Sequence, residues 1–128
     1  MWVTYLILVL AGVLSGSAVH AQSAPALKKG TAYSSVRETM IKHGFRPLDF
    51  PKEQQKQRCL GGTQICETYP ETNACAGTGR GQCEFVFRGR KGTLVVITTV
   101  GEDVANLRYD KSRRARRSEA KDLRQYVH

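Results

Sequence analysis

The chain has 128 residues, of which 20 are Lys or Arg and 11 are Asp or Glu, giving a formal net charge of +9. Leu, Ile, Val and Phe form only about a fifth of the residues after position 21, which is close to the level at which charged chains stop folding. One modest hydrophobic core is therefore possible. The length excludes a multidomain enzyme, a polytopic membrane protein and a large barrel.

The N-terminal segment has the pattern of an export signal. Residues 6–14 form an apolar run, and Val19-His20-Ala21 is a small-x-small cleavage site before Gln22. The apolar part of the segment is shorter than the roughly 20 residues that span a bilayer, which disfavours a retained anchor. We expect residues 1–21 to be a signal peptide and the mature chain to be periplasmic or secreted, with no transmembrane segment.

The mature chain has four cysteines, and an even number in an exported chain predicts two disulfides. Three pairings are possible; short glycine-containing loops favour the sequential one. The spacing lacks the C-x2-C of zinc sites and any C-x-x-C redox motif, so we expect structural disulfides and no metal. The cysteines are Cys59, Cys66, Cys75 and Cys83.

The first part of the mature chain predicts a leader and a helix. Residues 22–30 are expected to be a flexible leader. Thr31 is a candidate N-cap for a helix over residues 32–43, which Gly44 would end. The expected buried stripe is Tyr33, Val36, Met40 and Ile41. Two prolines then predict a connector, followed by a polar loop or short turn over residues 52–58.

The second part predicts a sheet. Residues 65–69 form a possible short strand. Residues 83–88 and 93–100 are alternating and β-branched, and Gly89-Arg90-Lys91-Gly92 joins them, which predicts an antiparallel hairpin with a basic loop. After Gly101, residues 102–107 are expected to begin a helix, with Val104 and Leu107 packing back.

From position 108 the composition changes to eight Lys or Arg against three Asp or Glu. We expect residues 108–128 to be a basic tail, either helical or disordered. The whole predicts a single α+β domain over residues 31–107, in which a helix packs on a small antiparallel sheet, two disulfides stiffen one edge and the tail projects.

The sequence offers little for catalysis, and we expect no enzyme activity and no cofactor. The mature chain has only two histidines, and His43 falls at the end of the predicted helix, where a cation suits the helix dipole. No zinc-protease or hydrolase-elbow motif occurs. The glycine-rich segment 77–81 does not match a dinucleotide-binding loop; a backbone anion nest beside Arg80 is an alternative.

The leading hypothesis is a binding module for an acidic protein or an envelope polyanion, since clustered arginine favours polyanions. Export makes nucleic acid an unfavoured partner, and a merely solvated tail stays an alternative. The candidate contact residues are Arg80, Arg90, Lys91, Arg113, Arg114, Arg116 and Arg117.

Two other classes of function stay open. An inhibitor or immunity-type protein would present the disulfide loop around Tyr69-Pro70-Glu71 to one enzyme. A small hydrolase would use acids of the cysteine-rich segment, namely Glu67, Glu71 and Glu84.

Several short motifs resemble those of small, uncharacterised exported proteins of Gram-negative bacteria. The resemblance spans residues 30–104 and implies a periplasmic or secreted α+β domain with disulfides. It implies no catalytic residue, and residues after Leu107 lie outside it. The motifs are Gly30-x-x-Tyr33-x-x-Val36-Arg37, His43-Gly44-Phe45-x-Pro47, Cys66-x-x-Tyr69-Pro70-Glu71, Cys75, Cys83-x-Phe85-x-Phe87 and Thr99-Val100-Gly101-Glu102.

Overall fold

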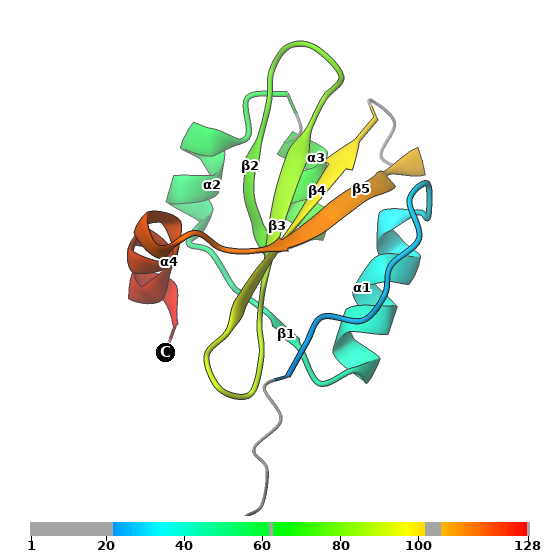
Figure 1. Ribbon diagram of the computed structural model, residues 1–128. Helices are drawn as coiled ribbons and strands as arrows, with labels where there is room; N and C mark the ends of the chain where they lie inside the picture. The colour runs from blue at the N-terminus through cyan, green and yellow to red at the C-terminus, as the bar shows by residue number, and fades with distance from the viewer. Residues whose placement is uncertain (1–21, 62, 102–105, 128) are drawn as a thin grey trace, which may run out of the picture.

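The computed structural model describes residues 22–61, 63–101 and 106–127 of the chain (Figure 1). The expected signal peptide, the expected helix start at residues 102–105 and His128 lie outside the described residues. Helices surround a five-stranded antiparallel sheet, so the α+β class is confirmed. Over the described ranges, none of the helices combines the length and apolar character that crossing a bilayer needs.

The sheet is organised around one central hairpin. Strands β3 (Cys83–Arg88) and β4 (Leu94–Val100) form the predicted antiparallel pair, and β5 (Arg108–Arg114) continues the sheet beyond β4. Strands β1 (Arg46–Pro47) and β2 (Thr72–Cys75) both pair with the other edge of β3. Because β1 takes the C-terminal end of β3 and β2 its N-terminal end, each end of β3 has different neighbours.

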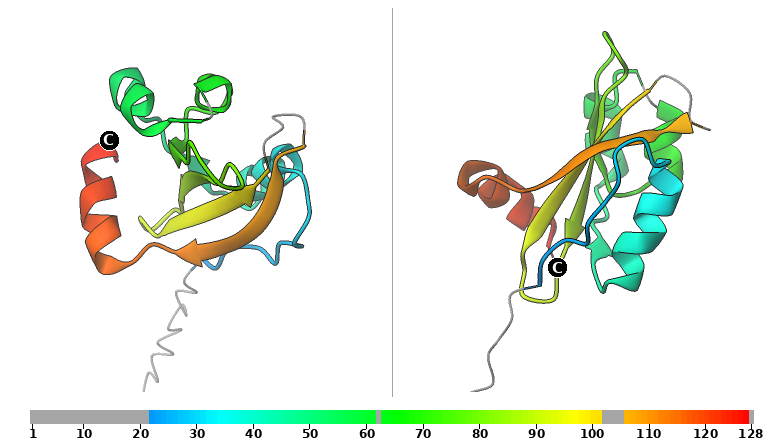
Figure 2. Two further views of the ribbon diagram at one scale, coloured as in Figure 1. Left: turned by 90° about the horizontal axis from the view of Figure 1, so that it is seen from above. Right: turned by 45° about the vertical axis from the view of Figure 1, so that its right-hand side comes forward.

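The two faces of the sheet carry separate cores. Helix α1 (Tyr33–Lys42) and the cysteine segment pack on the face that includes Phe85 and Phe87. Helix α4 (Arg117–Leu123) and the 3-10 helix η2 (Arg124–Tyr126) belong to the core on the opposite face (Figure 2). The alternation of side chains predicted for β3 is thus confirmed, because successive side chains of the strand point to opposite faces of the sheet.

Helix α1 is confirmed, with differences at both its start and its stripe. Tyr33, Val36 and Met40 are buried as expected, but the Ile41 side chain is 43% exposed. Thr31 does not cap the helix, because its hydroxyl donates a hydrogen bond to the Lys28 carbonyl. The end at Gly44 is confirmed.

The end of α1 depends on the backbone freedom of Gly44. Its φ of +83° lies in the left-handed region, where glycine carries no Cβ penalty. The next amide, that of Phe45, donates back to the carbonyl of Met40. The chain therefore turns sharply from the helix into β1.

Two expectations for the middle of the chain are wrong. Residues 52–58, expected to be a loop or turn, form helix α2 (Lys52–Arg58), and residues 65–69, expected to be a strand, lie mostly in helix α3 (Thr63–Thr68). The inward residue of α2 is polar, since Gln55 is only 3% exposed and its amide donates to the carbonyls of Pro70 and Thr72. An apolar stripe could not reveal such a helix.

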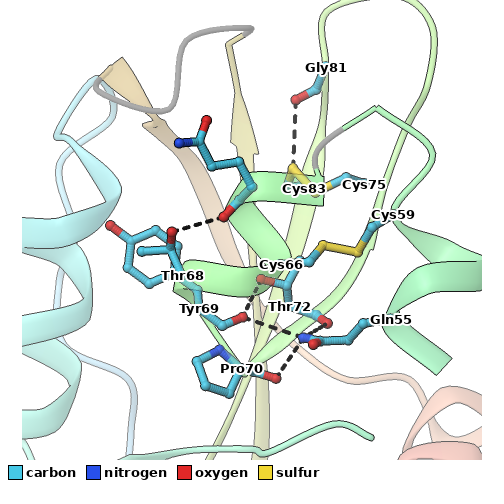
Figure 3. The surroundings of a disulfide bond; sticks show 11 residues. Gln55, Cys59, Cys66, Thr68, Tyr69, Pro70, Thr72, Cys75, Gly81 and Cys83 are labelled. Carbon is cyan, nitrogen blue, oxygen red and sulfur yellow. Dashed lines mark hydrogen bonds between the residues drawn. A yellow bond between two sulfur atoms is a disulfide. The ribbon is translucent and has the colours of Figure 1, made fainter. Parts of the chain in front are cut away.

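The sequential disulfide pairing is confirmed (Figure 3). Cys59 and Cys66 join the end of α2 to α3, and Cys75 and Cys83 join β2 to β3. All four residues are buried. In the chain-entropy view, each crosslink contributes on the order of 2–4 kcal/mol by restricting the unfolded chain.

The basic tail begins as a sheet strand, which corrects the expected boundary at Leu107. Strand β5 pairs with β4, and Tyr109 within it is only 6% exposed. Residues 117–123 are helical, in agreement with one of the two expected states. Pairing with an apolar neighbour, rather than the composition of β5 itself, makes this segment a strand.

The leader is bound to the domain along β5. The Gly30 amide donates to the Tyr109 carbonyl, and the Tyr109 amide donates to the Thr31 carbonyl. Ala24 and Leu27 pack against the core. The leader thus covers an edge that would otherwise be open to strand pairing by another chain.

Ending the chain at Leu107 should abolish cooperative folding. Loss of β5 exposes Val96 and Ile97, both fully buried, and burial of one such side chain is worth about 1.5–3 kcal/mol against a typical total of 5–15 kcal/mol. Thermal unfolding followed by circular dichroism measures the effect, with a chain ending at Tyr126 as control. An unchanged midpoint in the Leu107 truncation would show that β5 is dispensable.

Candidate anion-binding site

The structure divides the predicted contact residues among three places. Arg90 and Lys91 lie in the turn between β3 and β4, whereas Arg80 lies in the turn between β2 and β3, at the opposite end of β3. The remaining four arginines lie in β5 or at the start of α4. The seven residues therefore form no single patch.

The β3–β4 turn is built by its glycines. The Gly89 amide donates to the Thr93 carbonyl, the Gly92 amide donates to the Gly89 carbonyl, and Gly92 has a φ of +77°. A Cβ on Gly89 would lie 2.8 Å from the Gln22 side-chain oxygen and 3.2 Å from the Phe45 ring, so this position has no room for a side chain. The turn consequently holds Arg90 and Lys91 exposed at the tip of the hairpin.

The Gln22 side chain links this turn to the end of α1 by two hydrogen bonds. Its side-chain amide donates to the His43 carbonyl at 2.6 Å, and its side-chain oxygen accepts from the Arg90 backbone amide at 2.8 Å. His43 is the C-cap residue of α1, as the sequence predicts. The described leader therefore positions the backbone that carries Arg90.

The structure adds a pair of arginines next to the turn that no sequence pattern predicts. Arg46 of β1 and Arg88 of β3 are direct partners in the antiparallel register. Side chains of such partners stand on the same face with their Cβ atoms about 5 Å apart, and like charges placed so are destabilising. Among the described residues, no carboxylate forms an ion pair with either.

Three adjoining hollows lie at and beside the turn. One of about 330 Å³ is lined by Arg46, Arg88 and Arg90 together with glycines 44, 89 and 92. A second, of about 350 Å³, shares Arg46 and Arg88, and a third, of about 250 Å³, includes Lys91. We call the cations that line them the hairpin-end surface, namely Arg46, Arg88, Arg90, Lys91, Arg114 and Arg124.

This surface has the chemistry of an anion site. Guanidinium groups present forked N–H donors that match phosphate and carboxylate oxygens. Asp49 is the acid among the lining residues that the structure describes. Six cations against one acid leave a strong positive field at this end of the sheet.

The other predicted arginines have different surroundings. Arg113 donates to both oxygens of Glu119 and lies 3.6 Å from a carboxylate oxygen of Glu84. The hydrogen bond to Glu119 raises the pKa of Arg113, and the bond from Arg113 lowers that of Glu119. Arg116 and Arg117 are exposed at the start of α4 and line none of the three hollows.

The glycine-rich turn between β2 and β3 gives no support to the alternative of an anion nest beside Arg80. A hollow of about 210 Å³ is lined by glycines 77, 79 and 81, but Arg80 is not among its lining residues. The Arg80 backbone carbonyl instead accepts a hydrogen bond from the Gly101 amide. Arg80 lies at the opposite end of β3 from the hairpin-end surface.

The three acids of the hydrolase alternative do not converge. Glu67 is exposed beside the first disulfide and Glu84 faces Arg113, whereas Glu71 is fully buried. The burial of Glu71 also removes its side chain from the surface that an inhibitor loop would present. Neither alternative gains a common site from these residues.

Glu71 forms a buried polar cluster with Tyr33 and Arg37 of α1. One carboxylate oxygen accepts from the Tyr33 hydroxyl at 2.8 Å and from the Arg37 guanidinium at 2.6 Å. The Tyr33 ring stacks on Phe85 and meets Tyr69 edge-on. Burial, with the Glu71 charge beside it, holds the pKa of Tyr33 well above its ordinary value. The cluster joins α1 to the chain segment just before β2.

Comparisons of the chain with protein-family models, curated proteins and solved structures find no match. The resemblance to small exported proteins of Gram-negative bacteria therefore stays a prediction.

Tyr33→Phe should reduce the loss of stability at alkaline pH. Because the folded-state pKa of Tyr33 is raised, its contribution is complete below the unfolded value of about 10 and is lost as the pH rises above it. Urea unfolding between about pH 8 and about pH 11 measures this slope. Tyr126→Phe controls for loss of a hydroxyl elsewhere, and an unchanged slope in Tyr33→Phe would contradict the prediction.

Arg88→Gln should stabilise the protein in the absence of ligand. The substitution removes a like-charge partner of Arg46, and such pairs cost about 0.2–1 kcal/mol. The free energy of unfolding in low salt measures the gain, and Arg80→Gln provides a variant with the same charge change at the far end of β3. A decrease in stability would show that Arg88 serves the fold itself.

Proposed function

We propose that this protein is a non-catalytic, exported binding module, and that its hairpin-end surface binds a phosphate-bearing polyanion of the cell envelope. The observation that carries the proposal is the direct pairing of Arg46 with Arg88 beside Arg90, without an ion-pair partner in the described chain. Like charges so placed are destabilising, and a bound anion that neutralises them offsets that cost. The two disulfides agree with an oxidising compartment outside the cytoplasm.

A polyanion fits the surface better than one small anion. The three hollows adjoin one another at and beside the turn, so that several anionic groups of one molecule can each meet a guanidinium or ammonium group. Guanidinium groups favour phosphate because two parallel hydrogen bonds can form. An acidic protein is the competing partner, and the experiment below separates the two.

Binding of inorganic polyphosphate, measured by titration calorimetry, tests the proposal. The double variant Arg46→Gln/Arg88→Gln should bind at least about tenfold more weakly, since one charged hydrogen bond contributes about 1.5–3 kcal/mol. The slope of log affinity against log salt should fall by about one to two, as for lost phosphate contacts.

A matched control loses the same charge elsewhere. Lys28→Gln/Arg80→Gln removes two exposed cations that line none of the three hollows at and beside the turn. Equal weakening by both double variants would mean that net charge alone drives binding. Binding of polyglutamate, but not polyphosphate, would favour an acidic protein partner.

A further inference from the structure

The four cysteines lie closer together than two independent crosslinks require. The sulfur atoms of Cys59, Cys66 and Cys75 are all within 4.8 Å of one another, so the sulfur of one disulfide lies beside both sulfurs of the other. The sulfur of Cys83 is not part of this group. The second disulfide therefore approaches the first through its Cys75 sulfur (Figure 3).

The backbone places Cys59 against Cys75 as well. The two residues are partners in an isolated parallel β-bridge, and the Leu60 amide donates to the Cys75 carbonyl. Bridge partners are about 5 Å apart at Cα, which lies within the range that a disulfide spans. A Cys59–Cys75 bond would consequently need little backbone movement.

The first disulfide can be reached by a small molecule. Cys59 and Cys66 line a hollow of about 270 Å³, together with Lys52, Gln55, Lys56 and Glu67. Of the two lysines that line this hollow, Lys56 is paired with Glu53 at 3.0 Å, which leaves Lys52 as the lining cation that favours the approach of an anionic thiolate. The disulfide is thus open to attack even though both cysteines are buried in the fold.

We propose that the two disulfides form one thiol–disulfide exchange site whose substrate is a dithiol. A dithiol thiolate attacks the Cys66 sulfur, forming a mixed disulfide and releasing the Cys59 thiolate. That thiolate attacks the Cys75 sulfur, so that a Cys59–Cys75 bond forms and the Cys83 thiolate leaves. The second thiol of the dithiol then resolves the mixed disulfide, and protons from water complete two protein thiols.

These reaction steps balance in electrons and protons. The dithiol is oxidised to a disulfide by loss of two electrons, and the protein gains two thiols, at Cys66 and Cys83. Cys59 is suited to the transfer because it is the β-bridge partner of Cys75 and its sulfur lies within 4.8 Å of the Cys75 sulfur.

Peptide mapping after limited reduction tests the proposal on the oxidised wild-type protein. One equivalent of dithiothreitol is added under native conditions, and free thiols are trapped with N-ethylmaleimide after an acid quench. Trypsin leaves Cys59, Cys66 and Cys75 in the peptide of residues 59–80 and Cys83 in the peptide of residues 81–88. Cleavage after Glu67 and Glu71 then separates the fragment with Cys59 and Cys66 from the fragment with Cys75. Fragmentation of the linked pair in the mass spectrometer locates the label on Cys66 or on Cys59 and thereby assigns the bond.

The expected product carries label on Cys66 and Cys83 and a Cys59–Cys75 bond, with Cys75 unlabelled. Label on Cys59 and Cys66 together, with Cys75–Cys83 intact, would overturn the proposal. A Cys66–Cys75 bond would overturn the assignment of Cys59 as the attacking thiol, and an oxidised protein that resists the dithiol would overturn the whole.

A variant separates exchange from direct attack on the second disulfide. Cys75 and Cys83 also line a surface hollow, so a dithiol could reach them independently. In Cys59→Ser/Cys66→Ser, label should enter Cys83 at least about tenfold more slowly than in the wild type, because intramolecular attack has a far higher effective concentration. Equally fast labelling would show that Cys83 is released without Cys59.

Discussion

Strand β3 is the constraint on which the rest of the structure depends. Its alternation places Phe85 and Phe87 in one core and Val86 in the other, so both faces of the sheet are anchored by one short strand. Its edge opposite β4 is shared by β1 and β2, which meet its two ends separately. The sulfur chemistry at Cys83 and the arginine pairing at Arg88 are therefore positioned by the same six residues.

The elements that have a regular pattern of apolar residues were predictable from the sequence. The alternating and β-branched residues predict β3 and β4, and an apolar stripe predicts α1, since these patterns are local. Helix α2 could not be predicted from an apolar stripe, because its buried residue is Gln55. The side-chain amide of Gln55 donates hydrogen bonds to backbone carbonyls instead of packing in an apolar core. Strand β5 could not be predicted from periodicity, because its buried aromatic residue, Tyr109, is surrounded in the sequence by charged residues. The segment is a strand because it pairs with β4.

The candidate site was predictable only in part, for a related reason. Arg90 and Lys91 could be placed in a turn because flanking glycines mark it. The pairing of Arg46 with Arg88 depends on the register of strands about 40 residues apart, which no local pattern encodes. Conversely, Arg113 belongs to a sequence cluster but is neutralised by acids on β3 and α4. Clustering of charge along the chain is thus a poor guide to clustering in space.

The two ends of β3 complement one another energetically. A like-charge pair at the Arg88 end costs about 0.2–1 kcal/mol, whereas a disulfide at the Cys83 end contributes about 2–4 kcal/mol. The crosslinked end can therefore stabilise a strand whose other end holds unfavourable charge. In the exchange that we propose, the new bond joins α2 to β2, and the crosslinks from α2 to α3 and from β2 to β3 are both lost. Exchange thus removes the crosslink from the strand that carries Arg88, so β3 physically connects the exchange site to the hairpin-end surface.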